Sequence, residues 1–295
     1  MVSRSLRFIG WTILLWALTI GIAAGDTEVT VDDTLIAVTE GDDAGEAMLK
    51  FINQPWKGDL DGMLERGLIR ALVVNSKTMY FSDKGRQRGI AFELLTTFQD
   101  YINKHYPPSV KHLKTTVAFV PVPRNQLIPA LLEGRGDIAV AALTITPERQ
   151  KQVDFSAPFF KKIDEIVVTG PASPELKTLD DLAGRTVFVR RSSSYFEHLS
   201  RLNANRSQAG KPEIPVREAD ERLEDYDLLE MVDAGIIPAI VVDSHKAGFW
   251  AGIFDHIKVH EDLAVRTGGE IAWAFRKDSP KLADTVNAFV AQHKK

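Results

Sequence analysis

The sequence predicts an α/β protein with two lobes, each built on a mostly parallel sheet flanked by helices. Short apolar runs typical of buried strands alternate with amphipathic helical patterns along most of the chain, which favours crossover connections. The pattern begins afresh near residue 165, and a chain of 295 residues suits two domains of about 100–150 residues each. We therefore expect a first lobe over residues 61–164 and a second lobe over residues 165–264.

The first 60 residues differ from the rest of the chain. Residues 1–25 carry Arg4 and Arg7 without any acid, followed by an apolar run and the small residues Ala-Ala-Gly, which is the layout of a cleavable secretory signal. The apolar run is roughly 16 residues, shorter than the about 20 that span a bilayer, so an uncleaved membrane anchor is the alternative. Residues 26–60 are expected to form a loosely ordered acidic lead-in. The expected location is the periplasm.

The elements of the first lobe follow one another as a strand, a hairpin-like loop and a helix, then as alternating strands and helices. Apolar residues at helical spacing predict the helices, and continuous apolar runs predict strands that are covered on both faces. The expected strands are 69–74, 115–123 and 137–145, and the expected helices are 59–66, 90–105 and 125–134. A further helix starts at Thr146-Pro147-Glu148, because Thr is a good N-cap and Pro suits the first helical position.

The second lobe repeats the alternation with fresh elements. Strands are expected at 164–170, 185–191, 237–243 and 257–261, and helices at 176–184, 194–203, 224–235 and 244–252. The end of the chain, 268–295, reads as a strand followed by an amphipathic helix with Pro280 near its start. The pattern alone leaves open which lobe this last segment joins.

Composition excludes several classes of function. The formal charge is −4, and about −6 without residues 1–25, so no basic surface is available for nucleic acid. With no cysteine the chain has no disulfide, no thiol nucleophile and no lipoprotein cysteine. There is no G-x-S-x-G, H-E-x-x-H or glycine-rich phosphate loop, and the 7 histidines are dispersed. We therefore expect no catalytic residue, no metal and no cofactor.

Arg149 lies in the first turn of the helix that starts at Thr146, where a basic residue is unfavourable to the helix dipole. The start of a helix that follows the carboxyl end of a strand also attracts anions, and a guanidinium can hold a carboxylate by two parallel hydrogen bonds. Arg149 is therefore a candidate ligand for a carboxylate. The alternative is a surface arginine paired with Glu148 or Asp154.

Asp243 and a serine triplet occupy corresponding places in the second lobe. Asp243 ends the strand 237–243, where it can accept from a ligand ammonium or simply cap the next helix. Together with Arg149 it would suit a zwitterion. Ser194 and Glu197 match a capping box, whereas Ser192 and Ser193 are left to face a ligand at the turn between strand and helix.

Several segments carry a resemblance to a known family. GDIAVAALTITPERQKQVDFSAPFF, LDDLAGRTVFV and DLLEMVDAGIIPAIVVD together resemble the family 3 extracellular solute-binding proteins of the periplasmic amino-acid-binding type, in order over about residues 60–295. The resemblance implies a type II periplasmic-binding-protein-like fold, in which two α/β lobes are joined by two hinge strands and the ligand lies in the cleft between them. It also implies that residues 265–295 return to the first lobe.

The same resemblance implies roles for individual residues. Thr144 and Arg149 would hold a ligand carboxylate, Asp243 its ammonium, and Tyr80 would pack an aromatic ring on the ligand. The turn of Ser192, Ser193 and Ser194 would add hydrogen bonds from the second lobe. Three positions depart from the family pattern, with Ala142 where serine is common, Ser192 where glycine is usual, and Pro238 in place of an aspartate. The first two departures leave the ligand's side-chain class in doubt.

A closer resemblance is to the non-catalytic domain of the membrane-bound lytic transglycosylase F group. It is carried by VRRSSSYFEHL, EDYDLLEMVDAGIIP, VVDSHKAGFW and KVHEDLAVRTGGEIAWAFRKDSPKL, whereas the Glu-Ser pair of that group's catalytic domain is absent from this sequence. The sequence thus predicts a module that is not itself an enzyme and that binds an amino acid or short peptide-like zwitterion for transport or sensing. The expected partners are an amino-acid-like or muropeptide-derived ligand and either a membrane permease or a lytic transglycosylase catalytic domain. In the latter case it would be the regulatory domain of a peptidoglycan lytic transglycosylase.

Overall fold

A computed structural model describes residues 42–108 and 114–293. The chain divides into two compact units, Met1–Glu46 and Ala47–Lys295. The expected secretory signal lies outside the described residues. The only described part of the first unit is the beginning of helix α1 (Asp42–Asn53), a helix that the sequence analysis did not predict within its acidic lead-in. Both lobes lie within the second unit.

The first lobe is built on three parallel strands in the order β4 (Thr116–Pro121), β1 (Leu68–Val73) and β5 (Ile138–Thr144). All six residues of β1 are buried, as expected for a strand covered on both faces. Helices cover the sheet and include α2 (Leu60–Glu65), α3 (Ile90–His105), α4 (Leu127–Glu133) and α9 (Pro280–His293). The hairpin-like loop is present as the antiparallel pair β2 (Phe81–Asp83) and β3 (Arg86–Arg88).

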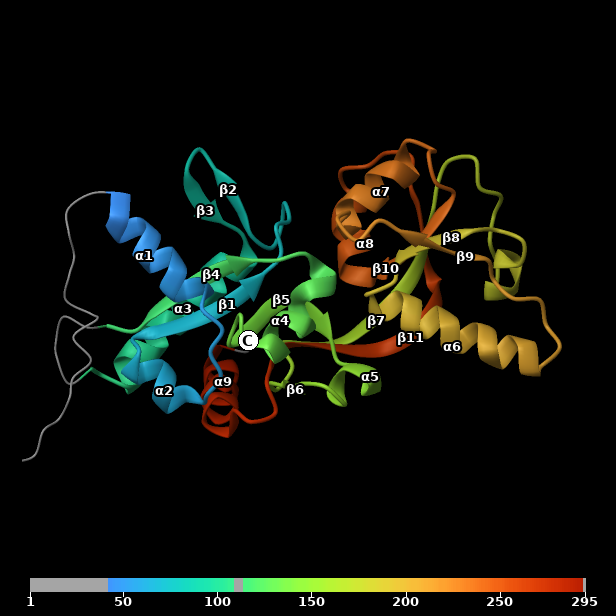
Figure 1. The fold of residues 1–295 in the computed structure, drawn as a ribbon. Helices are drawn as coiled ribbons and strands as arrows, with labels where there is room; N and C mark the ends of the chain where they lie inside the picture. Colours follow the sequence, from blue (N-terminus) through green and yellow to red (C-terminus); the bar gives the residue numbers. More distant parts are fainter. Residues whose placement is uncertain (1–41, 109–113, 294–295) are drawn as a thin grey trace, which may run out of the picture. The chain divides into compact units, whose positions relative to one another are not determined.

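Two long strands connect the first lobe to the second. β11 (Lys258–Phe275) pairs antiparallel with β5 at one end, and along its length with β7 (Phe160–Thr169). The sequence pattern divided β11 into two short strands, and this was wrong because Gly268 and Gly269 are absorbed as an irregularity within one strand. β7 and β11 are the hinge strands of the two-lobed fold (Figure 1).

The second lobe continues the same sheet beyond β7. Its strands follow in the order β10 (Ala239–Asp243), β8 (Val187–Arg190) and β9 (Val216–Ala219), of which β9 was not predicted. Its helical elements are η3 (Leu179–Leu182), α6 (Ser194–Gln208), α7 (Asp225–Asp233) and α8 (Ser244–Ala251). In the described part of the chain a single sheet of nine strands thus runs through both lobes, counting the short β6 (Asp154–Phe155) that pairs with β11.

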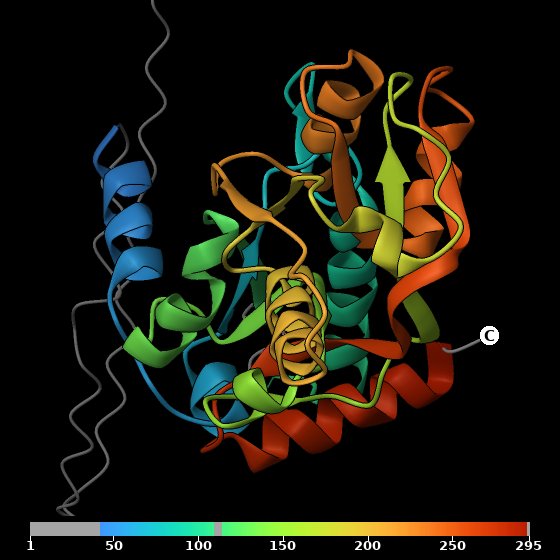
Figure 2. The same cartoon turned by 90° about the vertical axis from the view of Figure 1, so that its right-hand side faces the viewer.

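The last helix, α9, lies against the first lobe although it follows the second in sequence. Leu282, Val286 and Phe289 of α9 share one buried apolar cluster with residues of β1 and α3. Figures 1 and 2 both place α9 beside α2, with which it is in contact. The exact lobe boundaries given above stay a prediction.

Candidate functional site

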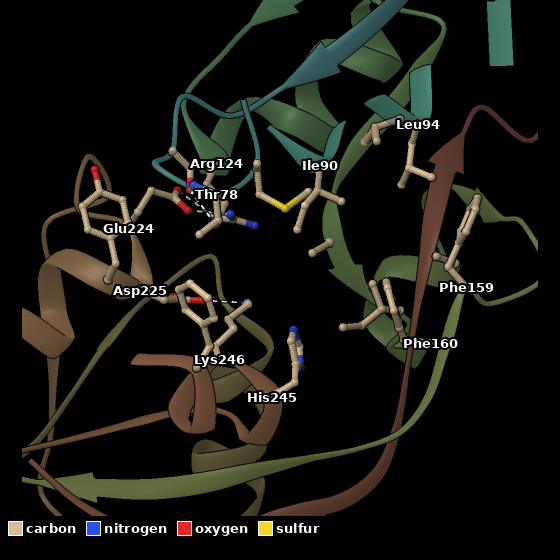
Figure 3. Close-up of a pocket in the computed structure, with 18 of the residues that line it drawn as sticks. Thr78, Ile90, Leu94, Arg124, Phe159, Phe160, Glu224, Asp225, His245 and Lys246 are labelled. Carbon is tan, nitrogen blue, oxygen red and sulfur yellow. Dashed lines mark hydrogen bonds and ion pairs between the residues drawn. The ribbon is translucent and has the colours of Figure 1, made fainter. Parts of the chain in front are cut away.

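A cavity of about 450 Å³ lies between the lobes and the hinge strands. Its wall combines residues of the first lobe such as Ile90 and Arg124, of the second lobe such as Glu224 and Lys246, and of the hinge strand β7 such as Phe160 (Figure 3). The size falls within the roughly 300–1,000 Å³ of small-molecule sites. A small solute therefore fits between the lobes.

An ion pair joins the two lobes at the polar end of this cavity. Arg124, from the short helix η2 (Arg124–Gln126), donates from Nε to Oε1 of Glu224 at 3.0 Å and from Nη2 to Oε2 at 2.6 Å. Its remaining terminal nitrogen, Nη1, donates to the carbonyl of Ala141 at 2.8 Å. Burial alone would lower the pKa of this guanidinium. The charge of Glu224 and its hydrogen bonds with Arg124 act in the opposite direction, and the pKa is raised above its ordinary value. Both lobes thus contribute to one bidentate contact.

A second charged group lies next to this pair in the second lobe. Asp225 accepts from Lys246 Nζ at 2.7 Å and from Arg190, and its side chain is almost fully buried. Burial alone would raise the pKa of the Asp225 carboxyl, but the charges of Lys246, Arg190 and Arg124 hold it well below its usual value. The opposite charges keep Lys246 protonated, since its pKa is raised despite burial.

A smaller cavity of about 20 Å³ gathers most of the residues that the sequence predicts as ligand contacts. Its lining includes Ala142, Thr144, Arg149, Ser193, Ser194 and Asp243. Arg124, Ala142, Asp225 and Lys246 line both cavities, which therefore adjoin each other. The smaller space has room for about one water molecule.

Arg149 is buried in this small cavity, with 7% of the residue exposed. Its Nη1 donates to the Thr144 carbonyl at 2.8 Å and its Nη2 to the Ser192 carbonyl at 2.9 Å, and Glu197 lies 3.6 Å from its Nε. Desolvation lowers the pKa of the guanidinium, although an arginine stays charged in proteins.

The surface alternative for Arg149 is wrong. Glu148 pairs with Arg201, and Asp154 pairs with Lys277, so neither suggested acid is its partner. The predicted helix start is confirmed, because Thr146 accepts from the Arg149 backbone N–H and Pro147 opens α5 (Pro147–Gln150). This local geometry turns the guanidinium back towards the end of β5 and the second lobe.

Asp243 is 1% exposed and ends β10. Its side chain makes no capping hydrogen bond to α8, so the capping alternative does not account for it. Lys246 Nζ lies 2.7 Å from its Oδ2, yet neither carboxylate oxygen accepts an aligned hydrogen bond from the described residues. Asp243 therefore retains acceptor capacity at the small cavity.

The three serines take different partners. Ser193, not Ser194, is the N-cap of α6, since its hydroxyl accepts from the Phe196 N–H at 3.2 Å. The expected capping box of Ser194 and Glu197 is therefore wrong. Ser194 donates to the Thr144 hydroxyl at 3.3 Å and so links the two lobes. Ser192 is bound to Glu221 through both its N–H and its hydroxyl.

Tyr80 and Ser192 lie outside the lining of both cavities. The ring of Tyr80 stacks on Phe119 at 5.3 Å between centroids, while its neighbours Thr78 and Met79 line the larger cavity. Ala142 lines both cavities and has a φ of 50°, a left-handed conformation that is unusual for a residue with a side chain. The structure thus brings six of the eight predicted residues together.

Sequence reasoning missed the charged residues of the larger cavity. Arg124 follows the carboxyl end of β4, which is where ligands of α/β sheets lie, so its position was a usable signal. Lys246 is three residues after Asp243, a spacing at which helical side chains meet. The apolar wall had no such signal, because its residues come from segments far apart in the sequence.

No group of three or more His, Cys, Asp or Glu side chains among residues 42–108 and 114–293 is placed to hold a metal ion. Over the same residues, no helix is both long enough and apolar enough to span a membrane.

A two-lobed sheet with cavities between its lobes defines a solute-binding protein. The chain belongs to the bacterial extracellular solute-binding proteins, family 3, which it matches over residues 74–295. It is 28% identical over 234 residues to "Membrane-bound lytic murein transglycosylase F" of Pseudomonas fluorescens, covering 78% of this chain and 44% of that protein. The protein of the same name from Methylobacillus flagellatus is 29% identical over 217 residues, covering 72% of this chain and 42% of that protein. The chain thus spans less than half the length of these relatives.

Solved structures of amino-acid-binding proteins share the fold. An ancestral arginine-binding protein bound to arginine is 25% identical with a TM-score of 0.62, covering 78% of this chain and 93% of that one. An ancestral amino-acid-binding protein, described as a precursor of cyclohexadienyl dehydratase, is 26% identical with a TM-score of 0.59, covering 80% of this chain and 92% of that one.

Proposed function

We propose that this chain binds one small zwitterionic solute, an amino acid or a short peptide, between its two lobes. The observation that carries the proposal is the cavity of about 450 Å³ whose wall is shared by both lobes and a hinge strand. The adjoining small cavity is lined by the buried guanidinium of Arg149 from the first lobe and the buried carboxylate of Asp243 from the second. A ligand that contacts both lobes favours the closed arrangement, which is how such a protein reports occupancy.

In this proposal the charged head group of the ligand lies where the two cavities adjoin, within reach of the residues that line the small one. Thr144 and Arg149 hold the carboxylate, which takes the place of the Ser192 carbonyl on Arg149 Nη2. Asp243 accepts from the ammonium through carboxylate oxygens that have no aligned partner. Ser193 and Ser194 add contacts from the second lobe. Tyr80 and Ser192 act indirectly, because neither lines a cavity.

The test is calorimetric titration of the full chain with a panel of amino acids, short peptides and muropeptide fragments. For the ligand that binds, Arg149→Ala loses about 2–5 kcal/mol of affinity, since it removes a buried charged contact. Arg201→Ala is the matched control, because Arg201 is about half exposed and pairs with the exposed Glu148. Asp243→Asn, which keeps the side-chain volume, is expected to weaken the binding of ligands that carry an ammonium. Equal binding by wild type and Arg149→Ala would show that the head-group site is wrong.

A second candidate function follows from the transglycosylase relatives. As a regulatory domain of a peptidoglycan lytic enzyme, the chain would bind a cell-wall fragment and signal through lobe closure to a catalytic domain. As a transport or sensing protein, it would deliver a free amino acid or peptide to a membrane permease. The same panel separates them, since preference for muropeptide fragments over free amino acids favours the regulatory role.

We also propose a location outside the cytoplasmic membrane. The family is described as extracellular, and the relatives named above are described as membrane-bound. Expression of the full chain with and without residues 1–25, followed by fractionation, tests this. If residues 1–25 are a cleaved signal, the exported protein lacks them and the truncated form stays in the cytoplasm.

A further inference from the structure

The larger cavity is apolar over most of its wall. Its aliphatic and aromatic lining comes from both lobes and the hinge region and includes Met79, Ile90, Leu94, Phe159, Phe160, Tyr226, Phe249, Trp250, Ile271 and Trp273. Figure 3 shows Leu94, Phe159 and Phe160 on the side of the cavity away from Arg124 and Glu224, with Ile90 between the two groups. The cavity therefore has a charged end and an apolar end.

Several of these apolar side chains are unusually exposed. Ile90 is 52% exposed, Phe160 54% and Phe249 57%. Large apolar side chains exposed around a hollow are typical of a binding site rather than of a random surface. A ligand group that covers them removes apolar surface from water, which favours binding.

The charged residues of the cavity wall already have partners. Arg124 is paired with Glu224, and Lys246 with Asp225. His245, which stacks on Phe160 at 6.3 Å between centroids, has its pKa lowered by burial and is neutral near pH 7. A ligand with a charged side chain would lose its hydration and find no unpaired opposite charge among the described wall residues, which is costly.

The two adjoining cavities suggest how one ligand is placed. A head group held at Arg149 and Asp243 projects its side chain past Ala142, which lines both spaces, into the larger cavity. At roughly 30 Å³ per water molecule, that cavity equals the volume of about 15 waters. This is enough for an aromatic side chain or for a dipeptide with one.

We propose that the ligand carries a bulky apolar side chain, aromatic or branched aliphatic, which packs against Ile90, Phe160 and Trp273. This inference rests on the proposed function and names its ligand class. It sets the chain apart from the structurally similar protein described as bound to arginine, whose ligand has a cationic side chain.

The first experiment compares ligands by calorimetry on the full chain at pH 7. The probes are L-phenylalanine, L-leucine and L-alanyl-L-phenylalanine against L-arginine and L-glutamine. We expect at least one apolar probe to bind ten-fold or more tightly than L-arginine, with a negative heat-capacity change that marks apolar burial.

The second experiment inverts the preference with a single charge. Ile90→Asp adds an unpaired carboxylate to the apolar wall at the first residue of α3, where an acid suits the helix dipole and the fold is preserved. The variant is expected to bind the best apolar probe at least ten-fold more weakly and L-arginine more tightly than wild type does. Ile236→Asp is the matched control, because Ile236 is 68% exposed and lies outside the cavity wall.

The outcomes separate the two proposals. Tight binding of L-arginine or L-glutamine that is lost in Arg149→Ala keeps the proposed function and overturns the apolar ligand class. Binding of an apolar probe that Ile90→Asp and Ile236→Asp affect equally also overturns the ligand class. If no amino acid or peptide probe binds, or if Arg149→Ala binds as wild type does, the proposed head-group site fails and the inference with it.

Discussion

At the scale of single residues, the predicted site owes its form to backbone geometry that residue types do not reveal. Arg149 is buried because the Thr146 cap sets the direction of the short helix α5, so its guanidinium meets carbonyls of Thr144 and Ser192. Ala142 drew notice in the sequence because serine, with its hydroxyl, is common at this position of the family. In the structure its most unusual feature is a φ of 50°. On the facing strand the register shifts between Ala272 and Ala274, so the two irregularities lie together. The bulge turns the end of β5 towards both cavities.

Ala142→Gly should stabilise the protein slightly or leave its stability unchanged. Glycine normally weakens a strand, but a residue with a side chain in the left-handed region carries a strain of about 1–3 kcal/mol, which glycine relieves. Urea denaturation measures the free energy of unfolding. Ala139→Gly, in the regular part of the same strand, is the control and should lose stability. A loss in Ala142→Gly as large as in Ala139→Gly would contradict the strain argument.

At the scale of elements, the alternation of strands and helices was predictable because each has its own apolar period. The predicted helix of residues 90–105 coincides with α3 (Ile90–His105), and the apolar run DIAVAALTI contains β5. The errors arose where tertiary contacts override local signals. Gly268 and Gly269 read as a break, but pairing with β7 carries the strand through them, and the Gly268 N–H donates to Asp164 at 2.8 Å.

The helix cap before α6 shows the same limit on a finer scale. Both Ser193 and Ser194 satisfy the local preference for a cap, so the sequence cannot choose between them. The structure uses Ser193 as the cap and leaves the Ser194 hydroxyl for Thr144 of the other lobe. Which serine faced the site therefore depended on a contact between residues 50 positions apart.

A buried group of charges that the pattern also missed links β1, β5 and β11. Asp137, just before β5, accepts from the guanidinium of Arg70 on β1 at 2.9 Å and lies 3.5 Å from Arg276 at the end of β11. Arg70 also donates to the carbonyls of Gln54 and Trp56, which anchors the extended segment before α2. Both side chains of the Arg70 and Asp137 pair are fully buried.

Asp137→Ala should therefore cost about 3–5 kcal/mol of stability, because it leaves buried guanidinium charge without a counter-charge. Urea denaturation again gives the free energy of unfolding. Asp154→Ala is the matched control, since its pair with Lys277 is about half exposed and should contribute less than about 1 kcal/mol. Similar losses in the two variants would show that burial of the pair is not what matters.

At the scale of the whole molecule, the proposed function depends on how the two lobes approach each other across the hinge strands. Polar contacts from one lobe to the other surround the cavities, and the pair of Arg124 and Glu224 is the most buried ion pair among them, with side chains 9% and 10% exposed. Lys77 and Glu230 also pair across the lobes, but at 3.8 Å and with both side chains more than half exposed. The resemblance implied a ligand cleft between two hinged lobes, whereas the residues that join the lobes across it became visible only in the folded chain.

Glu224→Gln should shift the chain towards an open arrangement. Glutamine keeps the volume of the side chain and its acceptor for the first turn of α7, so the change removes mainly the charge that holds Arg124. Truncating one partner of a buried charge pair costs about 2–5 kcal/mol in the closed form, whereas in an open form water solvates both groups. Small-angle X-ray scattering of the full chain should then give a larger radius of gyration than for wild type, and saturating ligand should reverse the increase.

Lys77→Gln is the control, because an exposed pair contributes about 0–1 kcal/mol and its loss should leave the radius unchanged. If Glu224→Gln has the wild-type radius of gyration without ligand, the contact between Arg124 and Glu224 does not hold the lobes together.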